Sequence, residues 1–335
     1  MSESVRVGIV GLGRLGRRHA ENLAFRVEGA RLVAAASPIE AERAWAETSL
    51  GGGVTTYSGL DALLAHPGLD AVWLVTPTSL HADQAIASIN AGKHVFCEKP
   101  LALDPRDCDR AVAAAADRPR QVVMVGFMRR FDPTYAEAKR RIEAGELGKV
   151  FAIRCVSEDP VDPNGFFVRF APTSGGIFLD CCIHDIDLVR WMLGGPEWAS
   201  VAAVGSRVMY PALSQCGDVD TGSANVVFTG GQIATFYVSR TSHRGYEASM
   251  TIVGDKGALE LGAAIPHTPL TLESGGRRST LGQVDFFERF GEAFLCEAQA
   301  FIKAVRGGGP TPLSLEDARE ATRLACAMRG ALKVG

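Results

Sequence analysis

The sequence predicts an α/β protein in which an N-terminal doubly wound parallel sheet precedes an α+β domain with a large, mostly antiparallel open sheet. Apolar strand-like runs alternate with helical stretches through the first third of the chain, the pattern of a parallel sheet covered by helices on both faces. Beyond Phe127, short strands follow one another with few helices, which favours hairpin pairing. The 335 residues, 47% of them hydrophobic, are sufficient for two cores. We therefore expect one domain over residues 1–126 and a second over residues 127–335.

The elements of the first domain are predicted from apolar runs and helix-start signals. Strands are expected over residues 5–10, 30–36, 55–57, 71–76, 94–97 and 122–126, and helices over 14–25, 37–48, 60–64, 81–91 and 105–116. Asp104-Pro105 marks the start of the last helix, since aspartate is a good N-cap and proline fits the first helical position. Parallel strands end at one edge of their sheet, so we expect a ligand to bind there.

The second domain is predicted to be dominated by strands. After a helix over 135–144 and a strand over 149–157, an irregular segment over 159–172 leads to a helix that opens near Gly176. Strands are expected over 198–208, 224–229, 232–239, 247–254 and 257–262, and helices over 286–305 and 315–331. Gly230-Gly231 predicts a hairpin turn, and Ser314-x-x-Asp317 predicts a capping box.

The first strand leads directly into three glycines with the spacing G-x-G-x-x-G. Gly11 allows a tight turn, Gly13 allows backbone to approach a pyrophosphate, and Gly16 allows close packing of helix on strand. The N–H groups and dipole at the start of the following helix favour an anion. Because the glycines lie between a strand and an amphipathic helix, the motif predicts a dinucleotide-binding domain of the Rossmann type instead of a plain glycine-rich turn.

Ser37 occupies the position where such domains usually carry an acidic residue that binds the ribose 2′-hydroxyl. Loss of that carboxylate would admit the 2′-phosphate of NADP. However, Ser37-Pro38-Ile39-Glu40 also reads as a capping box, which would occupy the serine hydroxyl with its own helix. Glu40 disfavours a 2′-phosphate, whereas Arg14 and Arg43 would favour one. We expect NAD, with NADP possible.

Two further segments follow strands of the first domain. Thr76-Pro77 follows the fourth strand, and Glu98-Lys99-Pro100 follows the fifth, where the nicotinamide end of a dinucleotide would lie. Pro100 restricts the Lys99 backbone to extended conformations and so limits the direction in which the ammonium group points. The alternative is an ordinary surface lysine at the end of a strand.

Asp180 and His184 are four residues apart on a predicted helix, so their side chains should leave the same face. An acid and a histidine at this spacing suit proton transfer, although a surface Asp–His pair is the alternative. We expect no metal, since no third ligand is indicated and a nearby lysine would repel a cation. Cys181 and Cys182 are expected to be packing residues, and none of the eight cysteines forms a C-x-x-C pair.

Charge and segment composition exclude several classes of partner. The net charge is −3 and the arginine pairs are scattered, so nucleic acid is an unexpected partner. The run from Thr221 to Ser239 has no charged residue, but its polar side chains and glycine pair favour a hairpin over a membrane span. No export signal is recognisable, so we expect a cytoplasmic protein that binds a small molecule and no membrane.

Several spaced motifs together resemble the Gfo/Idh/MocA oxidoreductase family, typified by glucose-fructose oxidoreductase and inositol dehydrogenase. They run in order over nearly the whole chain: Gly11-x-Gly13-x-x-Gly16, Ala91-Gly92-Lys93-His94-Val95-x-x-Glu98-Lys99-Pro100, Gly126-Phe127-Met128-Arg129-Arg130-Phe131-Asp132 and Gly175-Gly176-x-x-x-Asp180-x-x-x-His184-Asp185-x-Asp187. The third motif is most similar to that of inositol dehydrogenases, including the scyllo-inositol branch. The resemblance implies a homotetramer built on the second domain's sheet.

The resemblance also implies which residues form the site. The catalytic residues would be Lys99, Asp180 and His184. The cofactor-binding residues would be Gly11, Gly13, Arg14, Leu15, Gly16, Ser37, Thr76, Pro77, His81, Glu98 and Lys99. The substrate-binding residues would be Met128, Arg129, Asp159, Asn164 and Tyr246.

The residue types suit oxidation of a secondary alcohol by hydride transfer to NAD. Histidine, with an intrinsic pKa of about 6.5, suits the general base, and Lys99 would stabilise the developing alkoxide. We expect a cyclitol substrate, myo- or scyllo-inositol, because Arg129 offers several fixed donors to neighbouring hydroxyls. Alternatively, Arg129 and Arg130 only pair with carboxylates. Other open alternatives are a sugar or aminosugar dehydrogenase, an NAD-dependent glycosidase and a non-catalytic cofactor-sensing regulator.

Overall fold

The computed structural model describes residues 4–262, 271–274, 277–280, 285–307 and 313–335. These residues form two units. The first comprises Met1–Met128 together with Glu292–Thr322, and the second comprises Arg129–Gly291 together with Arg323–Gly335. The sequence predicted a break at 126/127 and assigned all of 127–335 to one domain. The structure differs from this prediction, because Glu292–Thr322 belongs to the first unit.

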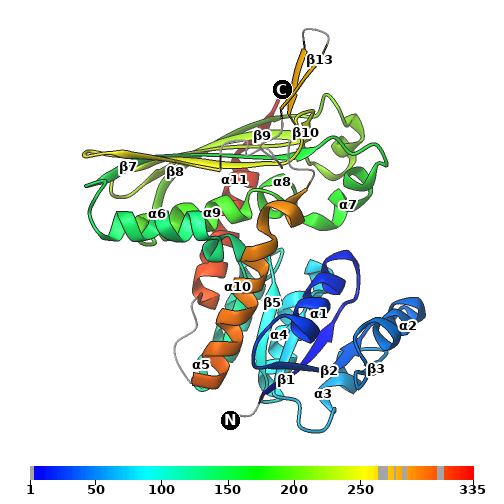
Figure 1. The fold of residues 1–335 in the computed structure, drawn as a ribbon. Coiled ribbons are helices and arrows are strands. Elements are labelled where there is room, and N and C mark those ends of the chain that lie inside the picture. The colour runs from blue at the N-terminus through cyan, green and yellow to red at the C-terminus, as the bar shows by residue number, and fades with distance from the viewer. Residues whose placement is uncertain (1–3, 263–270, 275–276, 281–284, 308–312) are drawn as a thin grey trace. The chain divides into compact units, whose positions relative to one another are not determined.

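The first unit contains a six-stranded sheet with the strand order β3-β2-β1-β4-β5-β6 (Figure 1). Its strands are β1 (Val5–Val10), β2 (Ala30–Ala36), β3 (Thr55–Tyr57), β4 (Ala71–Leu74), β5 (His94–Glu98) and β6 (Val123–Gly126), and its helices are α1 (Arg14–Phe25), α2 (Glu40–Ser49), α3 (Leu60–Leu64), α4 (Thr78–Asn90) and α5 (Pro105–Ala116). Every neighbouring pair of strands is parallel. The predicted doubly wound parallel sheet is confirmed, and β1 with β4 occupies its centre.

The core of the first unit explains why a late segment of the chain belongs to it. Trp73 of β4 stacks on Phe96 of β5 with ring centroids 3.7 Å apart, and both are fully buried. Phe301 packs edge-on against both rings from α10 (Phe286–Gly307). The backbone of α10 leaves helical geometry at Phe290, next to the boundary between the units. Burial of large aromatic rings therefore assigns most of α10 to the first sheet.

The second unit contains a seven-stranded sheet with the strand order β12-β11-β7-β10-β9-β8-β15. Its strands are β7 (Val150–Pro160), β8 (Trp198–Ser206), β9 (Thr221–Phe228), β10 (Ile233–Ser242), β11 (Glu247–Gly254), β12 (Ala258–Leu261) and β15 (Leu332–Val334), and a separate hairpin is formed by β13 (Thr271–Ser274) and β14 (Arg277–Thr280). Four of its six pairings are antiparallel, and β10 with β7 and β15 with β8 are parallel. The predicted mostly antiparallel sheet is confirmed.

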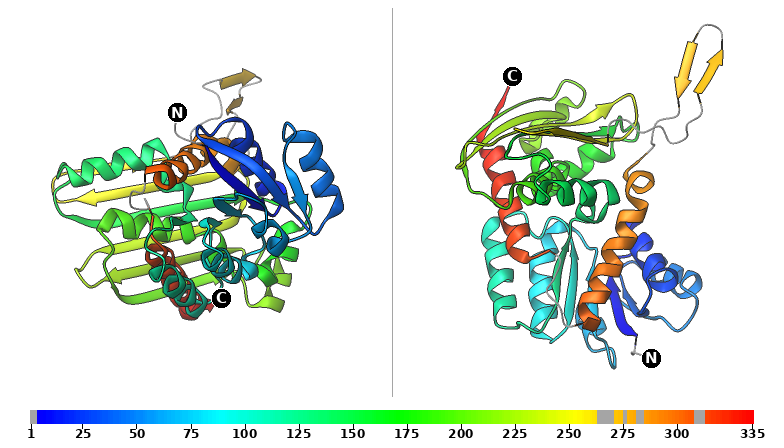
Figure 2. Two further views of the ribbon diagram at one scale, coloured as in Figure 1. Left: turned by 90° about the horizontal axis from the view of Figure 1, so that it is seen from below. Right: turned by 60° about the vertical axis from the view of Figure 1, so that its left-hand side comes forward.

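Helices α6 and α9 lie on one face of the seven-stranded sheet (Figure 1, and turned in Figure 2). The remaining helical elements of the chain are η1 (Met128–Phe131), α6 (Pro133–Glu143), α7 (Phe166–Ser174), α8 (Ile177–Asp180), α9 (Ile183–Leu193), η2 (Pro211–Cys216) and α11 (Leu315–Ala331). Side chains of β10 alternate, with Ala234, Phe236 and Val238 fully buried and Ile233 and Tyr237 exposed. The predicted turn at Gly230-Gly231 joins β9 to β10, with Gly231 at φ +83°.

Two predicted segments differ from the structure. Residues 159–172 were expected to be irregular, but α7 forms there, beginning after Gly165 in the left-handed conformation and containing Pro172 near its end. The single helix expected from Gly176 is two helices, because Cys181 and Cys182 form a turn between α8 and α9. Asp180 therefore ends one helix, and His184 lies in the first turn of the next. The expectation that both side chains leave the same face of one helix required a continuous helix, which does not form here.

Candidate functional site

The glycine-rich turn of the first unit has the form that a dinucleotide pyrophosphate requires. A Cβ at Gly11, where φ is +95°, would lie 2.3 Å from the Val75 carbonyl oxygen, and one at Gly16 would lie 2.0 Å from the Gly11 carbonyl oxygen. A Cβ at Gly13 would meet no atom within 4 Å. Gly13 is the N-cap of α1 and supplies no side-chain cap, and the first turn has no acidic residue. A helix start with neither a capping side chain nor an acidic residue in its first turn fits an anion.

Ser37 follows β2 and is nearly fully buried. Its hydroxyl accepts from the Ile39 N–H at 3.1 Å and donates to Glu42 Oε2 at 2.5 Å. The predicted capping box named Glu40 as the partner, which is wrong, because α2 begins at Glu40 with Ile39 as its N-cap, three residues later than expected. The serine hydroxyl is nevertheless occupied by its own helix, as the capping argument expected, and the carboxylate involved is that of Glu42.

The loops after β4 and β5 are tied together by His81 of α4. One ring nitrogen, Nδ1, lies 2.8 Å from the Pro100 carbonyl oxygen, and Nε2 lies 2.8 Å from the Thr76 carbonyl oxygen. Burial lowers the pKa of His81, while the two carbonyl groups oppose that effect. The Thr76 hydroxyl donates to Gln84 of the same helix at 2.6 Å. His81 thereby ties the segment that carries Thr76-Pro77 to the segment that carries Lys99.

Glu98 holds the backbone of Lys99. The Glu98 carboxylate accepts the Lys99 N–H at 3.0 Å, and its other oxygen lies 2.8 Å from His19 Nε2. Both Glu98 and His19 are buried, whereas Lys99 is partly exposed. The strand end that carries the predicted catalytic lysine is therefore anchored from inside the unit.

A second buried carboxyl group lies near Glu98 and was not predicted. Glu297 of α10 is fully buried, and neither of its oxygens has a hydrogen-bond partner among the described residues. Burial and the neighbouring Glu98 charge raise the pKa of Glu297 well above its usual range. This direction of shift favours the protonated form of Glu297 in the core of the first unit.

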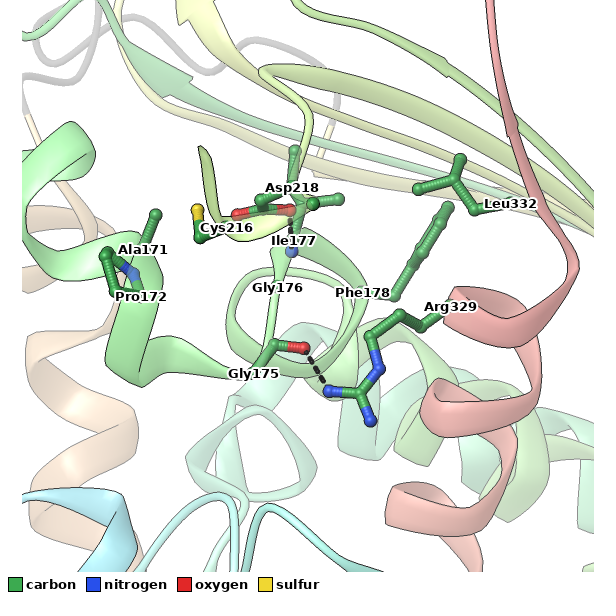
Figure 3. Close-up of a pocket in the computed structure, with 11 residues that line it drawn as sticks. Ala171, Pro172, Gly175, Gly176, Ile177, Phe178, Cys216, Asp218, Arg329 and Leu332 are labelled. Atoms are coloured by element: carbon green, nitrogen blue, oxygen red, sulfur yellow. Dashed lines mark hydrogen bonds between the residues drawn. The ribbon is translucent and has the colours of Figure 1, made fainter. Parts of the chain in front are cut away.

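In the second unit, Asp180 is held by a buried arginine at the end of α8. The Arg240 guanidinium donates to Asp180 Oδ2 at 2.9 Å and to Asp218 Oδ2 at 3.0 Å, and Arg240 has no exposed surface. The other Asp218 oxygen accepts the Ile177 N–H, the first of α8, at 2.8 Å (Figure 3). Asp218 thus fixes the start of this short helix and Arg240 fixes its end, which orients the Asp180 carboxylate.

A cavity of about 130 Å³ lies at the N-terminal end of α8 (Figure 3). Its lining includes Gly175, Gly176, Asp218 and Arg329, and Arg329 donates to the Gly175 carbonyl oxygen at 3.0 Å. None of the predicted site residues lines it.

Cys181, between α8 and α9, has a pKa raised well above its usual range by burial, which agrees with a packing role and not with a nucleophile.

Arg129 and Arg130 both pair with buried carboxylates of α9. Arg129 Nη1 donates to Asp185 Oδ1 at 2.6 Å and to the Ser157 hydroxyl at 3.2 Å, and Nη2 donates to the Tyr246 hydroxyl at 3.0 Å. Arg130 donates to both oxygens of Asp187. Both arginines therefore pair with carboxylates, as the alternative interpretation predicted. Arg129 already uses three of its N–H donors within the protein.

The other predicted substrate residues lie in different surroundings. Burial raises the pKa of Tyr246 to about 12, so its hydroxyl keeps its proton. Asp159 lies on β7, where its Oδ2 accepts from the Cys181 thiol at 3.4 Å. Asn164 is exposed just before α7, and Met128 is buried. The contacts of the second unit thus bring together Asp159 with Asp180 through Cys181, and Arg129 with Tyr246.

Sequence reasoning missed Arg240, Asp218, Glu42 and Glu297. A signal existed for Arg240, because Ala234, Phe236, Val238 and Arg240 occupy alternate, inward positions of β10. A charged residue in that register requires a buried counter-charge. No comparable signal marks Glu297, whose helix position looks ordinary until the sheet beneath it is known.

The open glycine-rich turn on a doubly wound sheet, joined to a unit that holds a fixed aspartate beside a histidine-bearing helix, defines a dinucleotide-dependent oxidoreductase of two domains. Residues 5–127 match the model of the oxidoreductase family with an NAD-binding Rossmann fold, and residues 135–260 match the GFO/IDH/MocA C-terminal domain. The chain belongs to the Gfo/Idh/MocA family, as its motifs implied.

Similar proteins carry names for inositol oxidation. A scyllo-inositol 2-dehydrogenase (NAD(+)) of Bacillus subtilis is 38% identical over 93% of this chain and 89% of its own length. A myo-inositol 2-dehydrogenase of Thermotoga maritima is 34% identical over 98% and 96%. The crystal structure of scyllo-inositol dehydrogenase from Lactobacillus casei with bound NAD(H) and scyllo-inositol superposes with a TM-score of 0.93, with 36% identity over 98% and 97%.

No helix among the described residues has the length and apolar character needed to cross a bilayer.

Proposed function

We propose that this chain is an NAD-dependent inositol dehydrogenase that oxidises one ring carbon of a cyclitol to the ketone of an inosose. The observation that carries the proposal is near full-length similarity to proteins named for this reaction. The relative named for scyllo-inositol is 38% identical to this chain and the one named for myo-inositol 34%. We therefore propose scyllo- or myo-inositol as the substrate.

We assign catalysis to Lys99, His184 and Asp180. When bound, NAD accepts a hydride from the alcohol carbon. His184 takes the hydroxyl proton as general base, and the Lys99 ammonium stabilises the alkoxide that develops on the same oxygen. Support for a fixed Lys99 comes from Glu98 and His81, which anchor its backbone segment on both sides. In this assignment His184 removes the proton from the substrate oxygen, and Lys99 stabilises the negative charge that develops on it.

Asp180 accepts a hydrogen bond from the substrate or from Lys99, and its orientation comes from Arg240. Because one Asp180 oxygen is already bound by Arg240, the carboxylate has a defined direction for its remaining lone pairs. This arrangement removes the need to orient the carboxylate during each turnover.

The polyol hydroxyls are assigned to Tyr246, Asp159 and Asn164, with Met128 and Arg129 beside them. The Tyr246 oxygen accepts from Arg129, so its own proton is left for a substrate oxygen. Arg129 therefore acts mainly through Tyr246. Missing ring hydroxyls would leave such polar groups without partners, which disfavours less hydroxylated alcohols.

We further propose that the enzyme is a cytoplasmic homotetramer.

The test is a spectrophotometric panel of inositols, aldoses and aminosugars with NAD and NADP, using wild type, Lys99→Ala, His184→Ala and the exposed control Lys303→Ala. We expect NAD reduction with scyllo- or myo-inositol. Each catalytic substitution should lower kcat roughly 10²–10⁴-fold with little change in NADH affinity. Strong activity on an aldose with none on any inositol would refute the cyclitol assignment, and near wild-type turnover of Lys99→Ala would refute its catalytic role.

A further inference from the structure

The end of β2 has a carboxylate even though its own residue is a serine. In dinucleotide-binding domains an acidic residue at this position accepts the ribose 2′-hydroxyl. Here the buried Ser37 hydroxyl donates to Glu42 Oε2 at 2.5 Å, and Glu42 lies in the first turn of α2. The hydrogen bond holds the Glu42 carboxylate at the strand end, so an acid reaches this position from the helix instead of the strand.

Glu42 and Gly13 of the glycine-rich turn line the same open cavity of about 680 Å³. The lining residues are Gly13, Arg14, Arg17, Arg18, Glu21, Glu42 and Trp45. Gly13 is the exposed N-cap of α1, where the pyrophosphate is expected. The cavity therefore extends from the pyrophosphate position toward α2, along the direction in which the adenosine end of a dinucleotide continues.

Side chains of both charges line this cavity. Arg14, Arg17 and Arg18 contribute three cationic groups from one helix, and the Arg17 guanidinium lies over the Trp45 ring, 4.8 Å from its centroid. Arg43 donates to the Ser37 carbonyl oxygen at 2.7 Å. These arginines would attract a phosphate, whereas the Glu42 carboxylate would repel one at the position of the 2′-substituent.

We propose that Glu42, held by Ser37, is the residue that selects NAD over NADP: its carboxylate accepts the ribose 2′-hydroxyl and repels a 2′-phosphate. The proposal rests on the dinucleotide-binding role of the first unit. It assigns discrimination to one charge, since the surrounding arginines already suit a phosphate. Removing that charge converts the cavity from one that rejects a 2′-phosphate into one that binds it.

The experiment measures binding instead of turnover. Dissociation constants of 5′-AMP and 2′,5′-ADP are obtained by calorimetry, and those of NADH and NADPH by fluorescence titration, for wild type, Glu42→Gln and Glu21→Gln. Glutamine keeps the volume and the hydrogen bond to Ser37 but removes the charge. Glu21→Gln is the matched control, because it removes an acid from the same cavity that has no contact with Ser37.

For Glu42→Gln we expect affinity for 2′,5′-ADP relative to 5′-AMP to rise about tenfold or more, and the gain to shrink as salt increases. The ratio for Glu21→Gln should change far less. An unchanged ratio in Glu42→Gln, or an equal change in both variants, overturns the role of Glu42 while leaving the cofactor assignment intact. Wild-type protein that binds neither NADH nor NADPH would overturn both. Should Glu42→Gln fail to fold, Ser37→Ala, which frees the carboxylate from its anchor, must shift the ratio in the same direction.

Discussion

Arg240 and Asp180 form an ion pair over 2.9 Å in which the guanidinium has no exposed surface. Removing such a cation from water costs several kcal/mol, and a single partner rarely compensates. Arg240 has two partners, because Asp218 also accepts from it at 3.0 Å. Asp218 in turn holds the first N–H of α8, so both ends of this four-residue helix depend on one buried network.

This network should be costly to break. Arg240→Met leaves two carboxylates without their shared cation, and we expect a loss of about 3–5 kcal/mol in the free energy of unfolding. Urea denaturation monitored by circular dichroism measures it. Arg154→Met, which removes an exposed arginine from the same sheet, should cost within about 0.5 kcal/mol. Equal losses in the two variants would show that the buried network adds nothing.

The glycine-rich turn provides two substitutions with opposite consequences. Gly13→Ala adds a methyl group that meets no protein atom within 4 Å, so stability should change by less than about 0.5 kcal/mol while NADH binding weakens about tenfold or more. Gly16→Ala places its Cβ 2.0 Å from a backbone oxygen and should lower stability by about 1–3 kcal/mol. Thermal unfolding and NADH titration separate these effects. Unchanged NADH affinity in Gly13→Ala would contradict the pyrophosphate position.

Glu297 predicts a dependence of stability on pH. Its pKa is raised in the folded state, so the folded state holds a proton that the unfolded state loses above about pH 4.3. The stability it contributes is complete below that pH and declines as pH rises toward the folded pKa. Glu297→Gln removes the titration, and its advantage over wild type should grow from pH 5 to pH 8 in urea unfolding. A constant difference across this range would contradict a protonated Glu297.

The outward face of the seven-stranded sheet predicts assembly. Ile233 is 47% exposed and faces Val227 of β9, with Tyr237 on the same side of β10. Apolar side chains in such a row favour contact with a second copy. Sedimentation at micromolar concentration should give a tetramer for wild type and smaller species for Ile233→Lys. Val208→Lys, at an 82% exposed position outside the sheet, should remain tetrameric. A monomeric wild type would contradict the proposal.

Much of the fold was predictable because local signals and tertiary packing agree. Strand β2 and helix α5 have the predicted bounds, and Asp104 accepts the Arg106 N–H as its N-cap role requires. The capping box at Ser314 and Asp317 also forms. Such elements depend on neighbours within a few residues, which a sequence displays directly.

The parts that escaped prediction depend on distant residues. Helix α7 was missed because its Gly165 and Pro172 resemble loop residues, although the glycine lies outside the helix and the proline only near its end. Ser37 was correctly given a capping role, but its acceptor is Glu42, since α2 begins later than the motif suggested. Arg240 and Asp180 are joined only when β10 lies beside α8, and the spacing of the two residues along the chain contains no trace of that contact.

The aromatic packing of α10 has a consequence for biosynthesis. Strands β4 and β5 leave the ribosome early, whereas Phe294 and Phe301 are translated only after strands β7 to β14. Trp73 and Phe96 consequently lack Phe301 while strands β7 to β14 are synthesised, and the core of the nascent first unit is incomplete during that time. The first unit can therefore complete its core only after α10 has been synthesised, later than every strand of the seven-stranded sheet except β15.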